Sequence, residues 1–235
     1  MTIALGIDFG DYIFIAADTR TVAYDRLGRI IHVKDDSQKI IRTRFGLVTG
    51  SGYLDLLDAI KSKLVEENSE LHTDKILDII KAEWTKCEDE EGHIPFKTRL
   101  IYTYSTTIKN ISKLRLAYYD PDQGHVLGIV SEKNKPLIIF PSETKKEEIE
   151  PLTNFLEEKI KLFKEFENLS DSIQYHCEII GTAIVQVQPN YPSISSLFQI
   201  GIHALEGWGI SPIIDIKSPE SVSIELTPLQ QGNHT

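Results

Sequence analysis

The sequence is poor in cysteine and contains no long apolar run. Its 235 residues include two cysteines, too few for a disulfide framework or a four-cysteine zinc site. No apolar run approaches the ~20 residues that a membrane-spanning helix needs. The first basic residue, Arg20, follows the opening apolar segment, unlike the order in a secretory leader. We therefore expect a cytoplasmic protein with reduced thiols and no membrane partner.

Basic residues are also outnumbered. The chain has 25 Lys and Arg against 35 Asp and Glu, which gives a net charge of -10. Binding to a phosphate backbone needs a basic face, so this balance argues against nucleic acid as the main partner. The seven histidines are scattered, and none forms a pattern of the HExxH type. We expect neither a metal nor a cofactor.

The remaining composition is that of a globular domain with a substantial core. Hydrophobic residues make up 41% of the chain, and neither a repeat nor a linker divides it. The patterns follow the order strands, two helices, strands, helices, strands. This order predicts a single α+β domain over residues 2–228, with two sheets and helices outside them, followed by a flexible tail over 229–235.

Periodicity and turn residues predict the individual elements. Apolar runs predict strands at 3–9 and 12–17, joined by a turn at Gly10-Asp11. Helical spacing predicts helices at about 53–67 and from Thr73 to the acidic run 87–92. The other expected elements are a small hairpin around 25–28, a strand pair over 39–52, strands at 99–108, 113–120, 125–130 and 136–140, a long helix at 151–169, strands within 173–187, a helix at 193–206, and strands at 213–217 and 222–226.

Thr2 is the candidate nucleophile, because it directly precedes the first apolar run. A threonine hydroxyl is a poor nucleophile unless a nearby base accepts its proton. If Met1 is removed, Thr2 gains a free α-amine, whose reference pKa of about 8 suits a general base near neutral pH. A cation beside the amine would lower its pKa further by disfavouring the ammonium form.

Other residues complete this candidate site. Lys39 is the preferred cation because it opens an apolar strand, and Asp18 would hold it by a salt bridge; Lys34 is the alternative. Gly50 is the expected backbone donor to a tetrahedral oxyanion, since glycine allows a close approach, and Ser51 and Gly52 are alternatives. Two further residues, Thr19 and Thr21, are expected to line the cleft.

The first part of the chain resembles a proteasome β-type subunit of the N-terminal nucleophile hydrolases. The motif Ala16-Ala17-Asp18-Thr19-Arg20 ends the second strand, and the spacing from Thr2 to Asp18 is similar to that from nucleophile to aspartate in the family. A lysine at the head of the next strand and a glycine-rich strand end before a helix also fit, at Lys39 and at 49–52. Lys34 lies nearer the family's usual distance from the nucleophile. The resemblance is best over residues 1–85.

The resemblance is looser in the second half. Family members carry a Gly-Ser step and an Asp-x-x-Ser turn that support the N-terminal amine. Gly181-Thr182 and the turn at Glu206-Gly207-Trp208-Gly209 occupy corresponding places, so Thr182 and Glu206 become the candidate supporting residues. The helical segment at 142–170 looks like an insertion.

The resemblance implies a four-layer αββα sandwich and a threonine-type peptidase. It further implies peptide or unfolded-protein substrates, a homo-oligomeric ring or stack that encloses the sites, and an unfoldase partner. One alternative is a catalytically silent assembly subunit of the same fold. Another is a nucleotide-binding protein, because LGIDFG at 5–10 resembles the first phosphate-binding turn of the sugar kinase, heat-shock chaperone and actin superfamily.

Overall fold

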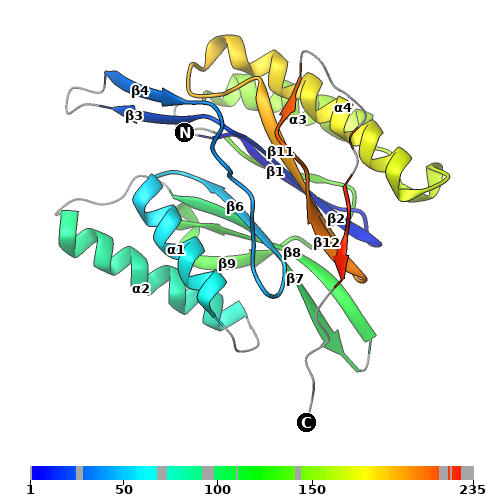
Figure 1. The fold of residues 1–235 in the computed structure, drawn as a ribbon, viewed down its shortest axis with the longest axis horizontal. Coiled ribbons are helices and arrows are strands. Elements are labelled where there is room, and N and C mark those ends of the chain that lie inside the picture. The colour runs from blue at the N-terminus through cyan, green and yellow to red at the C-terminus, as the bar shows by residue number, and fades with distance from the viewer. Residues whose placement is uncertain are drawn as a thin grey trace.

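In the part of the chain that the structure describes, the β structure consists of two large antiparallel sheets and a separate two-stranded hairpin (Figure 1). The structure is a computed structural model that describes residues 2–24, 29–67, 73–91, 98–109, 111–140, 144–216, 222 and 224–228. The predicted turn at 25–28 and the predicted tail at 229–235 lie outside these residues.

The first sheet contains both strands of the opening segment. Its strand order is β10-β1-β2-β11-β12-β14, with β13 also paired to β11. The strands are β1 (Ala4–Asp8), β2 (Tyr12–Asp18), β10 (Pro136–Ile139), β11 (Leu197–Ala204), β12 (Gly207–Ile210), β13 (Ile214–Asp215) and β14 (Thr227–Pro228). The predicted hairpin of the first two strands is thereby confirmed. β14 begins just after the strand predicted at 222–226.

The second sheet has the order β5-β6-β7-β8-β9, and β3 pairs with β4 in the two-stranded hairpin. The strands are β3 (Thr21–Tyr24), β4 (Ile30–Lys34), β5 (Ile41–Arg42), β6 (Leu47–Ser51), β7 (Arg99–Ile108), β8 (Ile111–Asp120) and β9 (Val126–Ile129). Each strand lies within or beside a segment that the sequence predicts as β structure.

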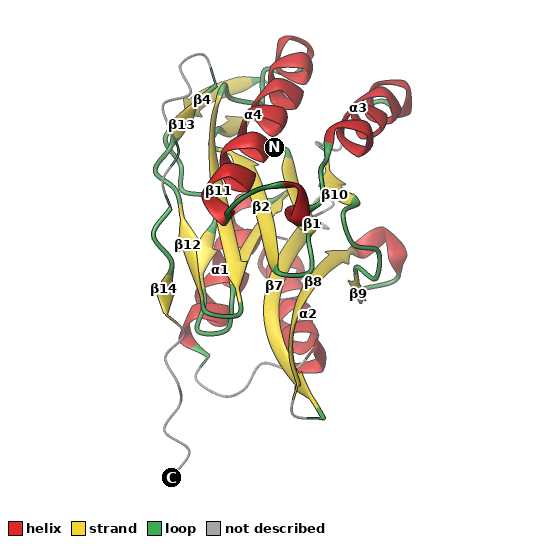
Figure 2. Ribbon diagram, turned by 90° about the vertical axis from the view of Figure 1, so that its right-hand side faces the viewer, coloured by secondary structure: helices red, strands yellow, loops and turns green. Residues whose placement is uncertain are grey.

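Helices cover both sheets. Helices α1 (Leu54–Glu66) and α2 (Thr73–Glu91) lie against the second sheet, whereas α3 (Lys146–Lys159) and α4 (Leu169–Val187) lie against the first (Figures 1 and 2). Short 3-10 helices occupy Pro121–Gln123, Phe163–Glu165 and Gln188–Asn190. The predicted α+β class is confirmed. Within the described residues, no helix combines the length and the apolar character required to cross a membrane.

In the described residues, apolar side chains from these sheets and helices pack together in three clusters. Leu5 and Ile7 of β1, together with Ile3 just before it, belong to a cluster shared with α3 and α4. Ala4 belongs to a different cluster, which lies between the two sheets, and a third cluster joins the second sheet to α1 and α2. Successive residues of a strand point to opposite faces, so β1 and β2 are buried on both sides. This burial explains their nearly continuous apolar sequences.

Glycine allows the two sheets to approach closely. A β-carbon on Gly6 would lie 2.9 Å from Leu116 Cδ1, and one on Gly201 would lie 2.7 Å from Leu47 Cδ1. Both distances are well below ordinary van der Waals contact. The missing side chains therefore make room for leucines of the facing sheet.

Two predicted elements late in the chain are exchanged. Residues 173–187 form helix α4 rather than strands, and residues 193–206 contain strand β11 rather than a helix. The β-branched residues of α4 recur at helical spacing and pack against the first sheet, which overrides their strand propensity. Asn168 begins the helix by accepting a hydrogen bond from Asp171 N at 3.0 Å.

The predicted long helix at 151–169 is also wrong in its bounds. Helix α3 begins five residues earlier, at Lys146, and ends at Lys159, so that Pro151 lies inside it. The next α-helix begins at Leu169, at the end of the predicted range. The apolar stripe is thus divided between α3, a 3-10 turn and the start of α4.

Candidate active site

The predicted nucleophile and aspartate meet at one end of the β1–β2 pair. The register of the two strands places Ala4 opposite Ala17, which brings Ile3 to Asp18. Ile3 N donates to Asp18 Oδ1 at 2.9 Å, and Asp18 N donates to Ile3 O at 3.2 Å. The carboxylate of Asp18 therefore binds the backbone directly after Thr2.

Asp18 is fully buried, and three backbone N–H groups donate to its carboxylate. Besides Ile3 N, Arg20 N and Ser195 N donate to Oδ2 at 3.0 and 3.1 Å. Burial raises the pKa of Asp18 to about 7, although the backbone donors and the charge of Lys39 act in the opposite direction. The carboxylate thus joins the start of β1, the end of β2 and the loop before β11.

Ser51 brings the second sheet to the same place. Thr2 N donates to Ser51 Oγ at 3.0 Å, and both residues are 3% exposed. Ser51 is the last residue of β6, whereas Thr2 precedes β1 of the other sheet. The candidate site therefore lies where the two sheets meet.

Gly50, the predicted oxyanion donor, lies next to Ser51 in β6. A β-carbon on Gly50 would contact Leu57 of α1 and the backbone of Arg99. The side of Gly50 on which a side chain would stand therefore faces the helix. Gly52, an alternative, has a φ of 139° that favours glycine. The role of the backbone over 50–52 as an oxyanion donor stays a prediction.

Of the two candidate lysines, Lys39 lies beside Asp18. Its ammonium donates to Thr21 Oγ1 at 2.8 Å, and the side chain is 8% exposed. Burial lowers the pKa of Lys39, and the nearby carboxylates of Asp18 and Asp58 partly oppose this shift. Lys34 is instead largely exposed and pairs with Asp36 at 3.6 Å. The carboxylate of Asp18 is held by backbone donors rather than by the predicted salt bridge.

The two predicted cleft threonines have different surroundings. Thr19 is fully buried, and its hydroxyl donates to Asp35 O and Leu197 O. Thr21 is half-buried and holds the Lys39 ammonium. Only Thr21 therefore contacts another predicted site residue through its side chain.

The structure does not bring Thr182 to the site. Thr182 lies on the exposed side of α4, where its hydroxyl donates to Glu178 O at 2.9 Å. Because residues 173–187 form a helix, the Gly181-Thr182 step is not a strand end.

Glu206 is also placed elsewhere. It is exposed at the turn between β11 and β12. In the register of β2 and β11, Phe198 lies opposite Asp18 and Ala204 lies opposite Tyr12. The turn that carries Glu206 is therefore beyond the far end of β2, about 20 Å from Asp18 at the usual rise of a strand.

Ser51 and Ser195 are the site residues that sequence reasoning missed in their observed roles. Ser195 N donates to the carboxylate of Asp18 from the loop after α4, whereas the resemblance placed the residues that support the amine at Thr182 and Glu206. A sequence signal exists in the small polar residues at 193–196, directly before an apolar strand. Assigning that segment to a helix concealed it.

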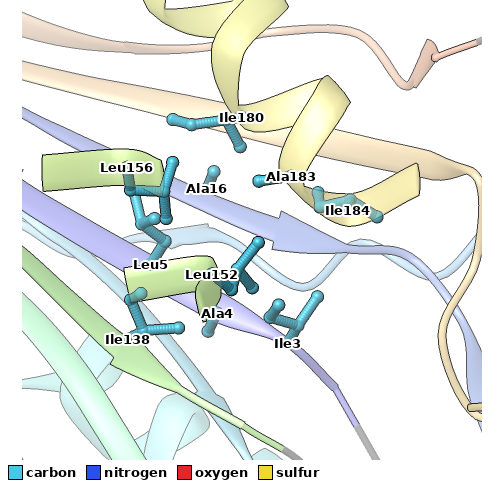
Figure 3. A pocket seen from close by; sticks show the side chains of 10 residues that line it. All are labelled: Ile3, Ala4, Leu5, Ala16, Ile138, Leu152, Leu156, Ile180, Ala183 and Ile184. Atoms are coloured by element: carbon cyan, nitrogen blue, oxygen red, sulfur yellow. The ribbon is translucent and has the colours of Figure 1, made fainter. Parts of the chain in front are cut away.

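An apolar void lies on the other face of β1, between this strand and helices α3 and α4 (Figure 3). Ile3 contributes to its lining, whereas Thr2 does not. Its walls carry no polar side chain and belong to the core. The lining consists of Ile3, Ala4, Leu5, Ala16, Ile138, Leu152, Leu156, Ile180, Ala183 and Ile184.

Asp8 is the aspartate of the LGIDFG segment on which the nucleotide-binding alternative rests. Its carboxylate accepts a hydrogen bond from Gly10 N at 2.7 Å and so closes the β1–β2 turn. The side chain is buried, and the charges acting on it are those of Lys133 and Arg115. LGIDFG is thus accounted for as a hairpin. Within the described residues, no cluster of three or more His, Cys, Asp or Glu could hold a metal ion.

No protein-family model matches the chain, and no curated protein matches its sequence. Solved structures do match its fold. An Anbu mutant from Hyphomicrobium sp. strain MC1 has a TM-score of 0.57 at 12% identity, over 97% of this chain and 88% of the other. Anbu from Yersinia bercovieri, described as an ancestral beta-subunit, has a TM-score of 0.58 at 13% identity, over 96% and 87%. The fold is similar to that of Anbu.

This finding corrects the family assignment. The resemblance in the sequence implied a divergent member of the proteasome β-type subunits, whereas the two similar solved structures named above are Anbu proteins. At 12–13% identity the likeness concerns the fold alone.

Proposed function

We propose that the chain is a threonine-type N-terminal nucleophile hydrolase that cleaves peptide bonds, with Thr2 as nucleophile after Met1 is removed. The observation that carries the proposal is the convergence of Ser51 and Asp18 on the backbone at Thr2 and Ile3. The helices on both outer sides of the two sheets support the four-layer αββα sandwich expected for such a hydrolase.

The proposed reaction begins at the Thr2 hydroxyl. Its oxygen attacks the peptide carbonyl carbon while its proton passes to the α-amine of the same residue. Collapse of the tetrahedral intermediate breaks the C–N bond, and the protonated amine returns the proton to the leaving nitrogen. Water then hydrolyses the ester and regenerates the hydroxyl. While Met1 is attached, the nitrogen is an amide and cannot act as this base.

Three neighbours would adapt the amine to this task. Ser51 Oγ is already placed to accept an N–H from the Thr2 nitrogen, which would orient the lone pair. Lys39 would supply the positive charge that favours a neutral amine, and Asp18 would help to keep Lys39 protonated. Backbone N–H groups over 50–52 would stabilise the oxyanion.

N-terminal mass measurement is the first test. The proposal requires a chain that begins at Thr2, and a retained Met1 in all of the purified protein would refute it. In the processed protein, Thr2→Ala should abolish covalent labelling by a peptide epoxyketone, whereas Thr2→Ser should keep it. Thr153→Ala is the matched control, because this hydroxyl only donates to Ile149 O within α3. Labelling that survives in Thr2→Ala would contradict the assignment.

A catalytically silent assembly subunit is the second candidate. Thr2 is 3% exposed, and the predicted supports Thr182 and Glu206 lie away from it. A processed chain that shows neither labelling nor peptide hydrolysis would favour this alternative.

For either function we propose that the chain assembles into a homo-oligomeric ring or stack. If the chain is an active peptidase, we also propose peptide or unfolded-protein substrates and an unfoldase partner. The support is the similarity of the fold to Anbu, one example of which is described as an ancestral beta-subunit. Analytical ultracentrifugation of the full chain tests the assembly. A monomer at micromolar concentration would contradict it.

A further inference from the structure

Lys61 is a buried lysine that the proposed reaction does not use. It lies on the buried face of α1 together with Leu57, Ile60 and Leu64, and it is 6% exposed. Lysine is rarely buried to this extent unless it is paired, because removing an ammonium from water costs several kcal/mol. Its position in the core therefore requires a partner.

That partner is the backbone of Lys39. Lys61 Nζ donates to Lys39 O at 2.9 Å, while Lys39 N donates to Gln199 Oε1 at 3.2 Å. Lys39 precedes β5, so side chains rather than strand neighbours take up both of its backbone groups. One side chain comes from α1 and the other from β11, which places Lys39 between this helix and the first sheet.

Gln199 is itself fixed. It is 6% exposed, and its amide donates to Ser211 O at 3.4 Å. The backbone at Lys39 is thus held on one side by the first sheet and on the other by a helix packed on the second. The direction in which the Lys39 side chain leaves the backbone, toward Thr21, depends on both contacts.

Two carboxylates act electrostatically on Lys61 and Lys39. Asp58 on α1 acts on both lysines, and Asp18 on β2 acts on Lys39. Burial and the positive charge of Lys39 together lower the pKa of Lys61 to about 8, and the carboxylate of Asp58 acts in the opposite direction.

We propose that Lys61 is a positioning residue, which holds the backbone of Lys39 so that the Lys39 ammonium stays on Thr21 and beside Asp18. The catalytic consequence rests on the proposed function, in which Lys39 is the cation of the site. The placement itself does not depend on catalysis.

The first measurement is therefore independent of activity. The pKa of Lys39 is obtained by NMR titration of the lysine side-chain nitrogens in the full chain. Lys61→Met keeps most of the length of the side chain but removes the donor that holds Lys39 O. The Lys39 ammonium should then leave its buried position, so the pKa of Lys39, which burial lowers, should rise by about one unit. Lys63→Met is the matched control, because this lysine of the same helix is exposed and pairs with Glu66. The control should leave the pKa of Lys39 unchanged.

A folded Lys61→Met protein with an unchanged Lys39 pKa would overturn the inference. If that variant does not fold, Lys61→Gln is used instead, because its shorter side chain falls short of Lys39 O. The same rise is expected, and its absence would equally overturn the inference. In a processed, active protein, Lys61→Met should lower kcat more than tenfold with little change in KM, and Lys61→Arg should restore part of the loss. If the pKa rises but even the wild-type protein neither labels nor hydrolyses, the proposed function fails and the placement of Lys39 stands.

Discussion

At the scale of single residues, the candidate site is organised by one carboxylate. Asp18 accepts backbone hydrogen bonds from Ile3, Arg20 and Ser195, which come from three different segments. A carboxylate can accept all three bonds because it carries no proton of its own when ionised. Asp18 therefore holds three backbone segments together, in addition to its proposed catalytic role.

Asp18→Asn should destabilise the protein by about 1–3 kcal/mol at pH 8, because the amide group would turn a donor toward at least one backbone N–H. Urea denaturation of both proteins measures the loss as a change in the free energy of unfolding. Asp36→Asn is the control, since the side chain of Asp36 is 72% exposed. Equal stability of the Asp18 variant and wild type would contradict the role of the carboxylate.

At the scale of elements, α4 shows how packing overrides local propensity. Its sequence is rich in β-branched residues, yet Ile173, Ile180 and Ile184 lie on one buried face against the first sheet. A stripe that covers a sheet can form on a helix, whereas a run buried on both faces requires a strand. The single sequence contains both kinds of segment within forty residues, and β-propensity alone does not distinguish them.

Substitutions at two glycines test the difference between a helix buried on one face and a strand buried on both. A β-carbon on Gly181 of α4 would find its nearest neighbour at 3.7 Å, an ordinary contact. Gly181→Ala should therefore stabilise the protein by about 0.5–1 kcal/mol, as expected in a helix interior. Gly201→Ala should instead cost about 1–3 kcal/mol, because its β-carbon would overlap Leu47. Thermal denaturation compares the two, and a destabilised Gly181→Ala protein would contradict the structure at this helix.

At the scale of the whole molecule, the layer between the sheets contains polar groups as well as apolar ones. His203 of β11 is fully buried, and its Nδ1 lies 2.9 Å from Thr103 Oγ1 of β7 in the other sheet. Thr103 Oγ1 also accepts from Leu47 N at 2.9 Å. Burial lowers the pKa of His203 to about 4, so the ring is neutral at physiological pH.

The stability of the protein should depend on this histidine between pH 4 and 6.5. The unfolded chain, in which histidine has a pKa near 6.5, binds the proton more tightly than the folded one. Stability from this group is present above pH 6.5 and falls by up to about 1.4 kcal/mol per pH unit as pH drops toward 4. His203→Asn should remove that part of the slope, and urea denaturation across this range measures it. His32→Asn, on the exposed strand β4, is the control; an unchanged slope in His203→Asn would contradict the inference.

The sequence alone determined the hairpin of β1 and β2 and the class of the fold. Continuous apolar runs on either side of a Gly-Asp turn favour one local structure, and the return of Asp18 to the residue after Thr2 follows from the length of that hairpin. The preference for Lys39 over Lys34 also followed from local sequence, because Lys39 precedes an apolar strand.

Only the tertiary structure decided what surrounds Thr2. Ser51, Ser195 and Lys61 reach the site from a strand end, a loop and a helix, and their contacts span 22 to 177 residues of sequence. Such contacts depend on how the two sheets pack and in which register the strands pair. Register is set by burial on both faces of a strand, which a one-dimensional pattern does not contain. For the same reason, the order of motifs along the chain predicted Thr182 and Glu206 as site residues, although the structure places both away from Thr2.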